Sequence, residues 1–144
     1  MTRTILMGGA LALVLGLGMA PAFAGGSTVS IQQYGWANAI GSGQSGHRNR
    51  LTVYQDGSGN TAISNQHGAN GRAVIGQAGR RHSADTYMRG RGNIVGVAQF
   101  GSHHTVVTTQ DGRGNAIGII QAGRGNHARA TQIGAGNVTV IVQD

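Results

Sequence analysis

The sequence contains neither cysteine nor lysine, and it has one proline, one tryptophan and four acidic residues among 144. Without cysteine, neither a disulfide nor a Cys–His catalytic pair can form. The four carboxylates, Asp56, Asp85, Asp111 and Asp144, show no spacing that suggests a catalytic pair, and no nucleophile elbow is present. These absences favour a protein that is not an enzyme, and nothing in the sequence calls for a cofactor.

Glycine is the residue that the sequence has in abundance, with 27 copies. The excess of arginine over acidic residues gives the chain a formal net charge of +7. A chain this rich in glycine cannot build a thick hydrophobic core against the cost of ordering its backbone. Composition by itself would therefore indicate disorder. The spacing of the residues indicates order instead.

The segment 1–24 has the three parts of a secretory signal peptide. Arg3 gives a positive start, an apolar run spans Ile5 to Leu17, and Ala22-Phe23-Ala24 is a small-x-small cleavage site. A transmembrane helix is the rival interpretation, but the apolar run is short and Pro21 follows it. The sequence therefore predicts a signal peptide at 1–24 and an exported domain at 25–144.

From residue 33 onward, glutamine recurs every eleven residues without insertion, except that methionine stands at position 88. Glycine follows each of the first ten positions by two residues, and asparagine follows most of them by five. The residues predicted to form ladders between repeats are Ser27, Gln33, Asn38, Gln44, Asn49, Gln55, Asn60, Gln66, Gln77, Asn93, Gln99, Gln110, Asn115, Gln121, Asn126, Gln132, Asn137 and Gln143. The predicted turn glycines are Gly35, Gly46, Gly57, Gly68, Gly79, Gly90, Gly101, Gly112, Gly123 and Gly134. A register this strict indicates a repeat architecture.

Between each asparagine and the next glutamine, small or apolar side chains occupy every second position, as in Asn93-x-Val95-x-Val97-x-Gln99. This period of two predicts a strand, and the Gln-x-Gly-x-x-Asn segment predicts a tight turn. Large β-branched residues such as Val97 alternate with small or polar ones such as Thr108 in successive strands. The full repeat therefore consists of two successive glutamine-to-glutamine units and contains two strands of different bulk.

We therefore expect an all-β, two-sheet β-solenoid of the cross-β, amyloid-like type with five and a half strand–turn–strand repeats. Five repeats run from Ser27 to Gln132, and a last half repeat runs from Asn137 to Gln143. Equivalent strands would stack about 4.7 Å apart, with glutamine on glutamine and asparagine on asparagine. Solenoids that stay monomeric cap their terminal coils, and the repeats show no cap at either end. Uncapped ends predict end-to-end polymerisation.

The pattern Ser27-x5-Gln33-x-Gly35-x2-Asn38, continuing to Gln44, resembles the curlin repeat of bacterial curli fibre subunits. The resemblance implies a secreted subunit of an extracellular functional amyloid in the biofilm matrix. It implies as partners further copies of the chain, the other curlin subunit, and an outer-membrane export channel with its accessory proteins. The third repeat departs from the pattern, with Gly71, His82 and Met88 in ladder positions. The basic charge favours the minor, nucleating subunit as an alternative to the major one.

His82 and His104 take the asparagine position in adjacent repeats and should therefore stack. A pH-sensitive pair or two ligands of a soft metal would be functional explanations, but a planar polar substitute within an amide ladder is simpler. The arginines in turns and outward positions are Arg48, Arg50, Arg72, Arg80, Arg81, Arg89, Arg91, Arg113, Arg124 and Arg129. A basic stripe of this kind would suit extracellular DNA or acidic polysaccharide, so a monomeric solenoid that binds such polyanions is the alternative function.

Overall fold

The computed structural model describes residues 25–144, and the predicted signal peptide lies outside these described residues. The described part of the chain contains eleven β-strands and no helix. The strands are β1 (Thr28–Trp36), β2 (Ala39–His47), β3 (Arg50–Ser58), β4 (Thr61–Ala69), β5 (Arg72–Arg80), β6 (Ser83–Arg91), β7 (Ile94–Ser102), β8 (Thr105–Arg113), β9 (Ala116–Gln121), β10 (His127–Ala135) and β11 (Val138–Gln143). Accordingly, no helix that could cross a membrane occurs between residues 25 and 144.

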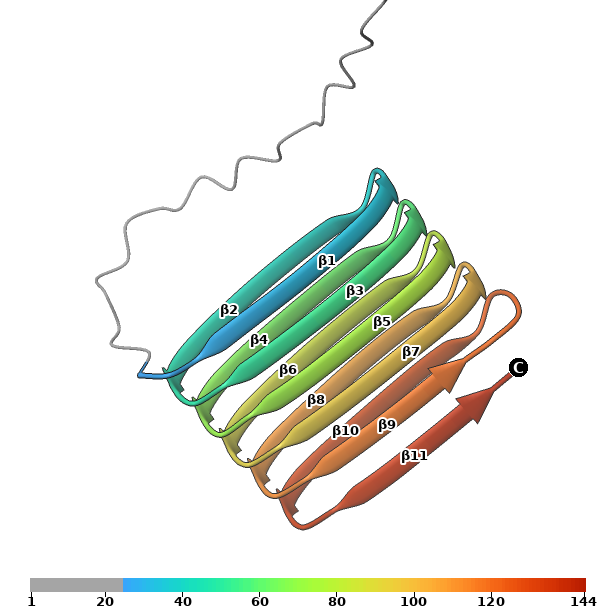
Figure 1. Cartoon of the computed structure of the whole chain (residues 1–144). Coiled ribbons are helices and arrows are strands. Elements are labelled where there is room, and N and C mark those ends of the chain that lie inside the picture. The colour runs from blue at the N-terminus through green and yellow to red at the C-terminus, as the bar shows by residue number, and fades with distance from the viewer. Residues whose placement is uncertain (1–24) are drawn as a thin grey trace, which may run out of the picture.

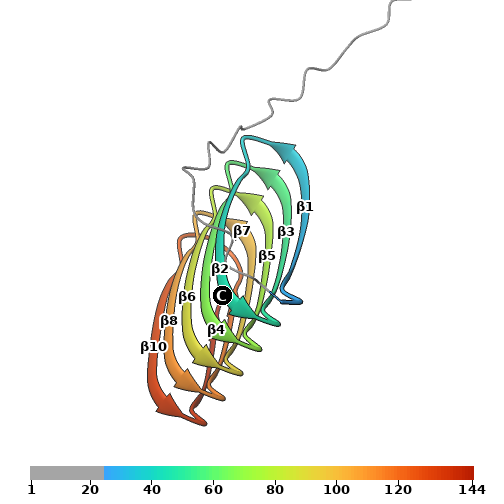
Figure 2. The same cartoon turned by 90° about the vertical axis from the view of Figure 1, so that its left-hand side faces the viewer.

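Successive strands alternate between two parallel sheets, so that each pair of strands forms one coil of a solenoid (Figure 1). The odd-numbered strands form a six-stranded sheet in the order β1-β3-β5-β7-β9-β11. The even-numbered strands form a five-stranded sheet in the order β10-β8-β6-β4-β2. Figure 2 shows the two sheets as facing layers joined by short turns. The predicted two-sheet β-solenoid is therefore confirmed.

The pairing register equals one full repeat throughout, as in Gln33↔Gln55 of the first sheet and Gln44↔Gln66 of the second. The reason lies in the core between the sheets. The odd-numbered strands direct bulky residues inward, including Leu51, Val53, Ile75, Val97 and Ile119. The even-numbered strands oppose them with smaller residues, including Ala62, Ala84, Thr86, Thr108 and Ala130. Large against small side chains fill a thin core, and a slip of one residue would turn every inward side chain to the outside.

The turns are shorter than the sequence predicted. Most strands continue through the glutamine and the glycine to the following residue, and the turn after β1 contains only Ala37 and Asn38. Each repeat glycine has a positive φ, and most of them pair with the glycine of the next coil, as in Gly35↔Gly57. A Cβ atom at Gly35 would lie 1.9 Å from the carbonyl oxygen of Gly57. Close approach between coils, in addition to backbone conformation, therefore requires glycine within the strand.

Candidate functional site

Glutamine side chains form hydrogen-bonded ladders that run through the solenoid from coil to coil. In the six-stranded sheet, each Nε2 donates to the Oε1 of the equivalent glutamine in the next coil, from Gln33 to Gln143, at 2.7 to 3.0 Å. The second amide hydrogen of an interior glutamine binds a backbone carbonyl of the opposite sheet, as in Gln77 Nε2 to Thr61 O at 2.9 Å. Each interior glutamine therefore links neighbouring coils and also links the two sheets.

Asparagine side chains form a second set of ladders beside the turns. The Nδ2 of Asn49 donates to the carbonyl oxygens of Ser45 and Gly68, at 3.1 Å each, while its Oδ1 accepts from the backbone N–H of Gly71 at 2.9 Å. Ser27 begins this ladder, because its Oγ accepts from the N–H of Asn49 at 3.1 Å. The equivalent contacts recur at Asn38, Asn60, Asn93, Asn115, Asn126 and Asn137. Asparagine thus supplies the donors and acceptors that a two-residue turn leaves unpaired.

His82 and His104 occupy the asparagine ladder that starts at Asn38, and they make the hydrogen bonds that asparagine makes elsewhere. Their rings stack with centroids 5.1 Å apart and planes inclined by 5°, and both residues are buried. The Nε2 of His82 faces the carbonyl oxygen of Ala78 at 3.2 Å, and its Nδ1 accepts from the backbone N–H of His104 at 3.4 Å. Because one nitrogen must donate while the other accepts, the hydrogen-bond network assigns a neutral ring protonated on Nε2.

The burial of His82 should make the stability of the fold depend on pH. Burial lowers the pKa of His82 below its ordinary value, against the opposing effect of the Ala78 carbonyl, and the neighbouring His104 lowers it further. A neutral buried base stabilises the fold fully above the pKa of the unfolded chain, about 6.5, and this stabilisation is lost as the pH falls below it. We expect a lower melting temperature at pH 5 than at pH 7.5, measured by circular dichroism.

The matched control for this pH effect replaces both rings by the ladder residue of neighbouring coils. In H82N/H104N, the same hydrogen bonds would form without a titrating group, so the difference between pH 5 and pH 7.5 should shrink. An unchanged difference in this variant would show that other groups cause the pH dependence.

Across residues 25–144, no group of three or more metal-ligating side chains converges on one point.

Met88 interrupts the glutamine ladder of the five-stranded sheet. It pairs in register with Gln66 on one side and Gln110 on the other. The Oε1 of Gln110 consequently has no hydrogen-bond partner, although the residue is fully buried. Gly71 lies within 3.7 Å of the Met88 methyl group, measured from the position that a Cβ atom of Gly71 would take. The methionine therefore uses space that an asparagine at position 71 would fill.

The substitution Met88→Gln should stabilise the fold by about 1–2 kcal/mol, because it gives Gln110 a donor and restores an acceptor to Gln66. Gln and Met have similar volumes, so the core needs little rearrangement. Urea denaturation of the soluble chain measures the change. The control Met88→Leu keeps an apolar side chain without an amide and should not stabilise. Equal midpoints for M88Q and the unchanged chain would mean that the broken ladder costs nothing.

The two ends of the solenoid expose edge strands and an open core. Among the described strands, β1 and β2 form one end and β10 and β11 form the other. The inward side chains of β1, Val29 and Ile31, are 44% and 46% exposed, whereas their equivalents Leu51 and Val53 are 0% and 1% exposed. No described coil covers the first pair. Edge strands of this kind present unpaired backbone groups together with apolar surface.

The glycines at the last coil also lack a covering layer. A Cβ atom at Gly112 would lie 1.8 Å from the carbonyl oxygen of Gly134. At Gly134 itself, the nearest atom would be 3.7 Å away, on the side chain of Asn137, and at Gly123 it would be 3.7 Å away, on Asp144. These two glycines leave the space that a further coil would occupy.

Within residues 25–144, consecutive glutamines of the predicted ladders are hydrogen-bonded except at Met88, whereas the asparagine ladders are interrupted at Gly71, His82 and His104. The sequence could not show that the glutamine ladders have a direction. Every glutamine–glutamine bond runs from Nε2 to the Oε1 of the next coil toward the C-terminal end, so unused acceptors face the N-terminal end; at the C-terminal end Gln143 retains a free amide hydrogen, while Gln132 donates to Ala116 O and Thr139 Oγ1. The direction of a glutamine ladder depends on the side-chain rotamer of each glutamine, and a repeat pattern in the sequence does not specify that rotamer.

Comparison with protein families supports the repeat. A family model described as the curlin associated repeat matches residues 46–79 and 105–134. The first match runs from the end of β2 to Gly79 in β5, and the second runs from the start of β8 to Gly134 in β10. No curated protein matches the chain.

Proposed function

We propose that this chain, whose residues 46–79 and 105–134 match the curlin associated repeat, is a secreted curlin-type structural subunit that polymerises end to end into extracellular functional-amyloid fibres. The observation that carries this proposal is the open core at the end of the solenoid, where Val29 and Ile31 are about half exposed. A second copy is the partner whose strands could stack on the exposed end strands and continue the glutamine ladders. Such fibres would serve adhesion and the biofilm matrix.

The direction of the glutamine ladders supports head-to-tail growth. At the C-terminal end, Gln143 donates to the carbonyl oxygen of His127 at 3.2 Å, and its second amide hydrogen faces away from the described coils. At the opposite end, no described coil precedes the Oε1 atoms of Gln33 and Gln44. Donors then meet acceptors only when unlike ends join, which is the arrangement that generates open filaments.

The curlin repeat family is structural, and its members are secreted fibre subunits, so the partners proposed here follow from the family. They are the other curlin subunit and an outer-membrane export channel with its accessory proteins, reached through the periplasm after removal of residues 1–24. Both the major subunit and the minor, nucleating subunit are compatible with the ladders. The net charge of +7 favours the nucleator.

Fibre formation by purified residues 25–144 tests the proposal. The assembled protein should bind amyloid dyes and give a meridional reflection at about 4.7 Å in fibre diffraction. A chain that stays soluble and monomeric at high concentration after long incubation, with neither property, would rule the proposal out. Cross-seeding then separates the two subunit roles: a nucleator shortens the lag time of the other curlin subunit when present as a small fraction, whereas a major subunit forms abundant fibres alone.

A further inference from the structure

Positive charge is concentrated along the two turn edges of the solenoid. The arginines in turns and at the C-terminal ends of strands are Arg48, Arg80, Arg81, Arg91, Arg113 and Arg124. Three of the four carboxylates, Asp56, Asp85 and Asp111, instead lie within strands, on the outer faces of the sheets. The strand-face arginines therefore have acidic residues on the same faces, whereas the turn edges carry one sign of charge.

The edge that follows the odd-numbered strands contains a groove with a volume of about 600 Å³. Its lining includes Arg80, Arg81, Ser102, His103, Arg124 and, toward the N-terminal coil, Trp36. No lining residue is acidic. The groove crosses several coils, and so it runs along the direction in which the coils stack.

Register places cations and hydroxyl groups alternately along this groove. Ser58, Arg80, Ser102 and Arg124 occupy equivalent positions in successive coils. Because coils stack about 4.7 Å apart, the two arginines of this row are roughly 9.5 Å apart along the groove. Beside them, the Nη1 of Arg81 lies 3.4 Å from the Nε2 of His103. The guanidinium of Arg81 and the imidazole of His103 therefore lie together on one face of the groove.

Two of these side chains stand where the backbone would suit glycine. Arg81 and His103 have φ values of 57° and 62°, and the equivalent residues in neighbouring coils are Gly59 and Gly125. A left-handed conformation costs a non-glycine residue roughly 1–2 kcal/mol. The Arg81 guanidinium and the His103 ring are thus held at strained backbone positions beside the groove, and backbone strain of this kind is common at ligand-binding sites.

We propose that this groove binds a linear acidic polysaccharide lying along the fibre axis. Guanidinium groups bind carboxylate or sulfate through paired hydrogen bonds, and the serine hydroxyls between them match the hydroxyl groups of a sugar chain. Channels for single-stranded nucleic acid need aromatic side chains under successive bases, and this groove has only Trp36. Each strand of duplex DNA carries a charge about every 3.4 Å along the axis, far denser than this row of arginines.

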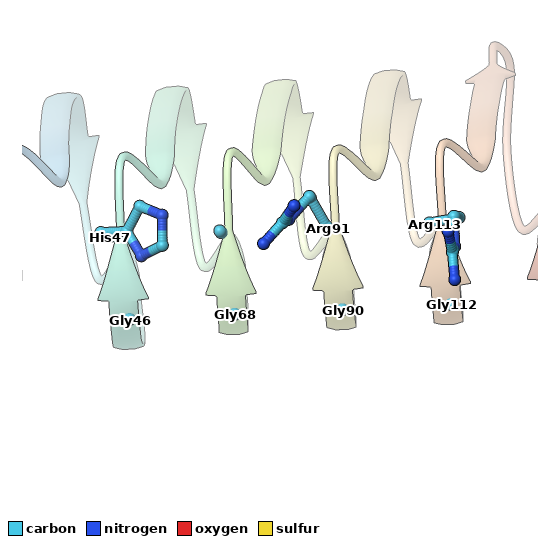
Figure 3. A pocket seen from close by; sticks show the side chains of 8 residues that line it. Gly46, His47, Gly68, Gly90, Arg91, Gly112 and Arg113 are labelled. Atoms are coloured by element: carbon cyan, nitrogen blue, oxygen red, sulfur yellow. The ribbon is translucent and has the colours of Figure 1, made fainter.

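The opposite turn edge contains a second groove, of about 690 Å³, but its lining differs (Figure 3). His47, Arg91 and Arg113 stand along it at the ends of β2, β6 and β8, and the other lining residues are glycines and Ala69. This groove offers no hydroxyl group to a sugar chain. It therefore provides a matched comparison: both grooves are lined by arginines, but only the first groove also presents serine hydroxyl groups.

Two triple variants test the proposal at equal net charge. The groove variant is R80S/R81G/R124S, in which each new residue already occupies the equivalent position in a neighbouring coil, such as Ser58, Ser102 or Gly59. The control is R48G/R91A/R113A on the opposite edge, with residues taken from Gly92, Ala69 and Ala135 in the same way. Circular dichroism and melting temperature check that both variants fold.

Binding is measured with alginate oligomers, heparin fragments and DNA of matched charge, through the fluorescence of Trp36, the only tryptophan in the chain. We expect the groove variant to bind alginate or heparin at least tenfold more weakly, and the control to change by less than threefold. Alginate carries carboxylates alone and heparin carries both carboxylates and sulfates, so binding of heparin without binding of alginate would assign the recognition to sulfate. Equal losses in the two variants, no loss in the groove variant, or tighter binding of DNA than of either polysaccharide would overturn the proposal. Soluble protein suffices, so the result does not depend on fibre formation.

Discussion

Alanine at Gly134 is expected to leave the soluble chain folded and to stop fibre growth at its C-terminal end. Within the solenoid, a Cβ atom at most repeat glycines would lie 1.8 to 2.0 Å from the carbonyl oxygen of the next coil. At Gly134 the nearest atom is 3.7 Å away, because no described coil follows. The substitution therefore clashes only with an added molecule. Its φ of 110° adds strain of about 1–3 kcal/mol to the chain itself.

The matched variant is Gly112→Ala, one coil earlier. There the new Cβ atom would overlap the carbonyl oxygen of Gly134 within the same molecule, so the last coils should not form. The measurements are the melting temperature of each soluble chain and the rate of elongation from preformed seeds. Gly134→Ala should still unfold cooperatively, with a melting temperature roughly 5–15 °C below that of the unchanged chain, yet elongate at least tenfold more slowly. Normal elongation by this folded variant would contradict growth by stacking at that end.

Alanine at Gln77 should be among the most destabilising single substitutions within the solenoid. Gln77 is 0% exposed, accepts from Gln55 Nε2 at 2.7 Å and donates to Gln99 Oε1 at 2.8 Å. Its loss leaves one N–H of Gln55 and the Oε1 of Gln99 without partners and removes the side-chain donor to the Thr61 carbonyl oxygen. Because each unpaired buried group costs about 1–3 kcal/mol, the two unpaired groups predict a total of roughly 2–6 kcal/mol. This is a large part of the usual stability of a domain, about 5–15 kcal/mol.

The comparison for Gln77 is Gln143→Ala at the end of the same ladder. Gln143 is only partly buried, and water can replace its contacts with Gln121 and His127. Urea denaturation should therefore show a loss of about 1 kcal/mol or less for Gln143→Ala. Seeded elongation should still slow, because Gln143 carries the donor that faces the next molecule. Similar losses of stability at positions 77 and 143 would mean that the ladder contributes little to the fold.

Sequence reasoning was sufficient for the general architecture because every coil repeats the same constraints. The alternation of Val97 with Thr108 indicated which sheet carries the bulky side chains, and the structure has the same arrangement. The stacking of His82 on His104 also followed from their equivalent positions in adjacent repeats. These predictions succeeded because strand period, register and repeat length depend on one another.

Several features of the site depend on atoms that no repeat pattern specifies. The strands extend through glycines such as Gly35, because the same positive φ in every coil keeps the backbone N–H groups of one coil paired with the carbonyl groups of the next. Met88 and Gly71 proved to be coupled departures, since the methionine methyl group lies near the space that an asparagine would take. The nitrogen of each histidine that faces a backbone N–H could be assigned only from the ladder geometry.

The sequence by itself determined the repeat length, the strand alternation and the two-sheet solenoid, because a period of two and a spacing of eleven leave few other packings. Only the tertiary structure decided where the strands end, which way the amide ladders point and which arginines share a groove. Those properties arise when coils lie about 4.7 Å apart, since residues one full repeat apart then become neighbours. At that distance, a glycine carbonyl excludes a Cβ atom from the neighbouring coil, a glutamine rotamer sets the direction of a ladder, and an arginine with positive φ lines a groove.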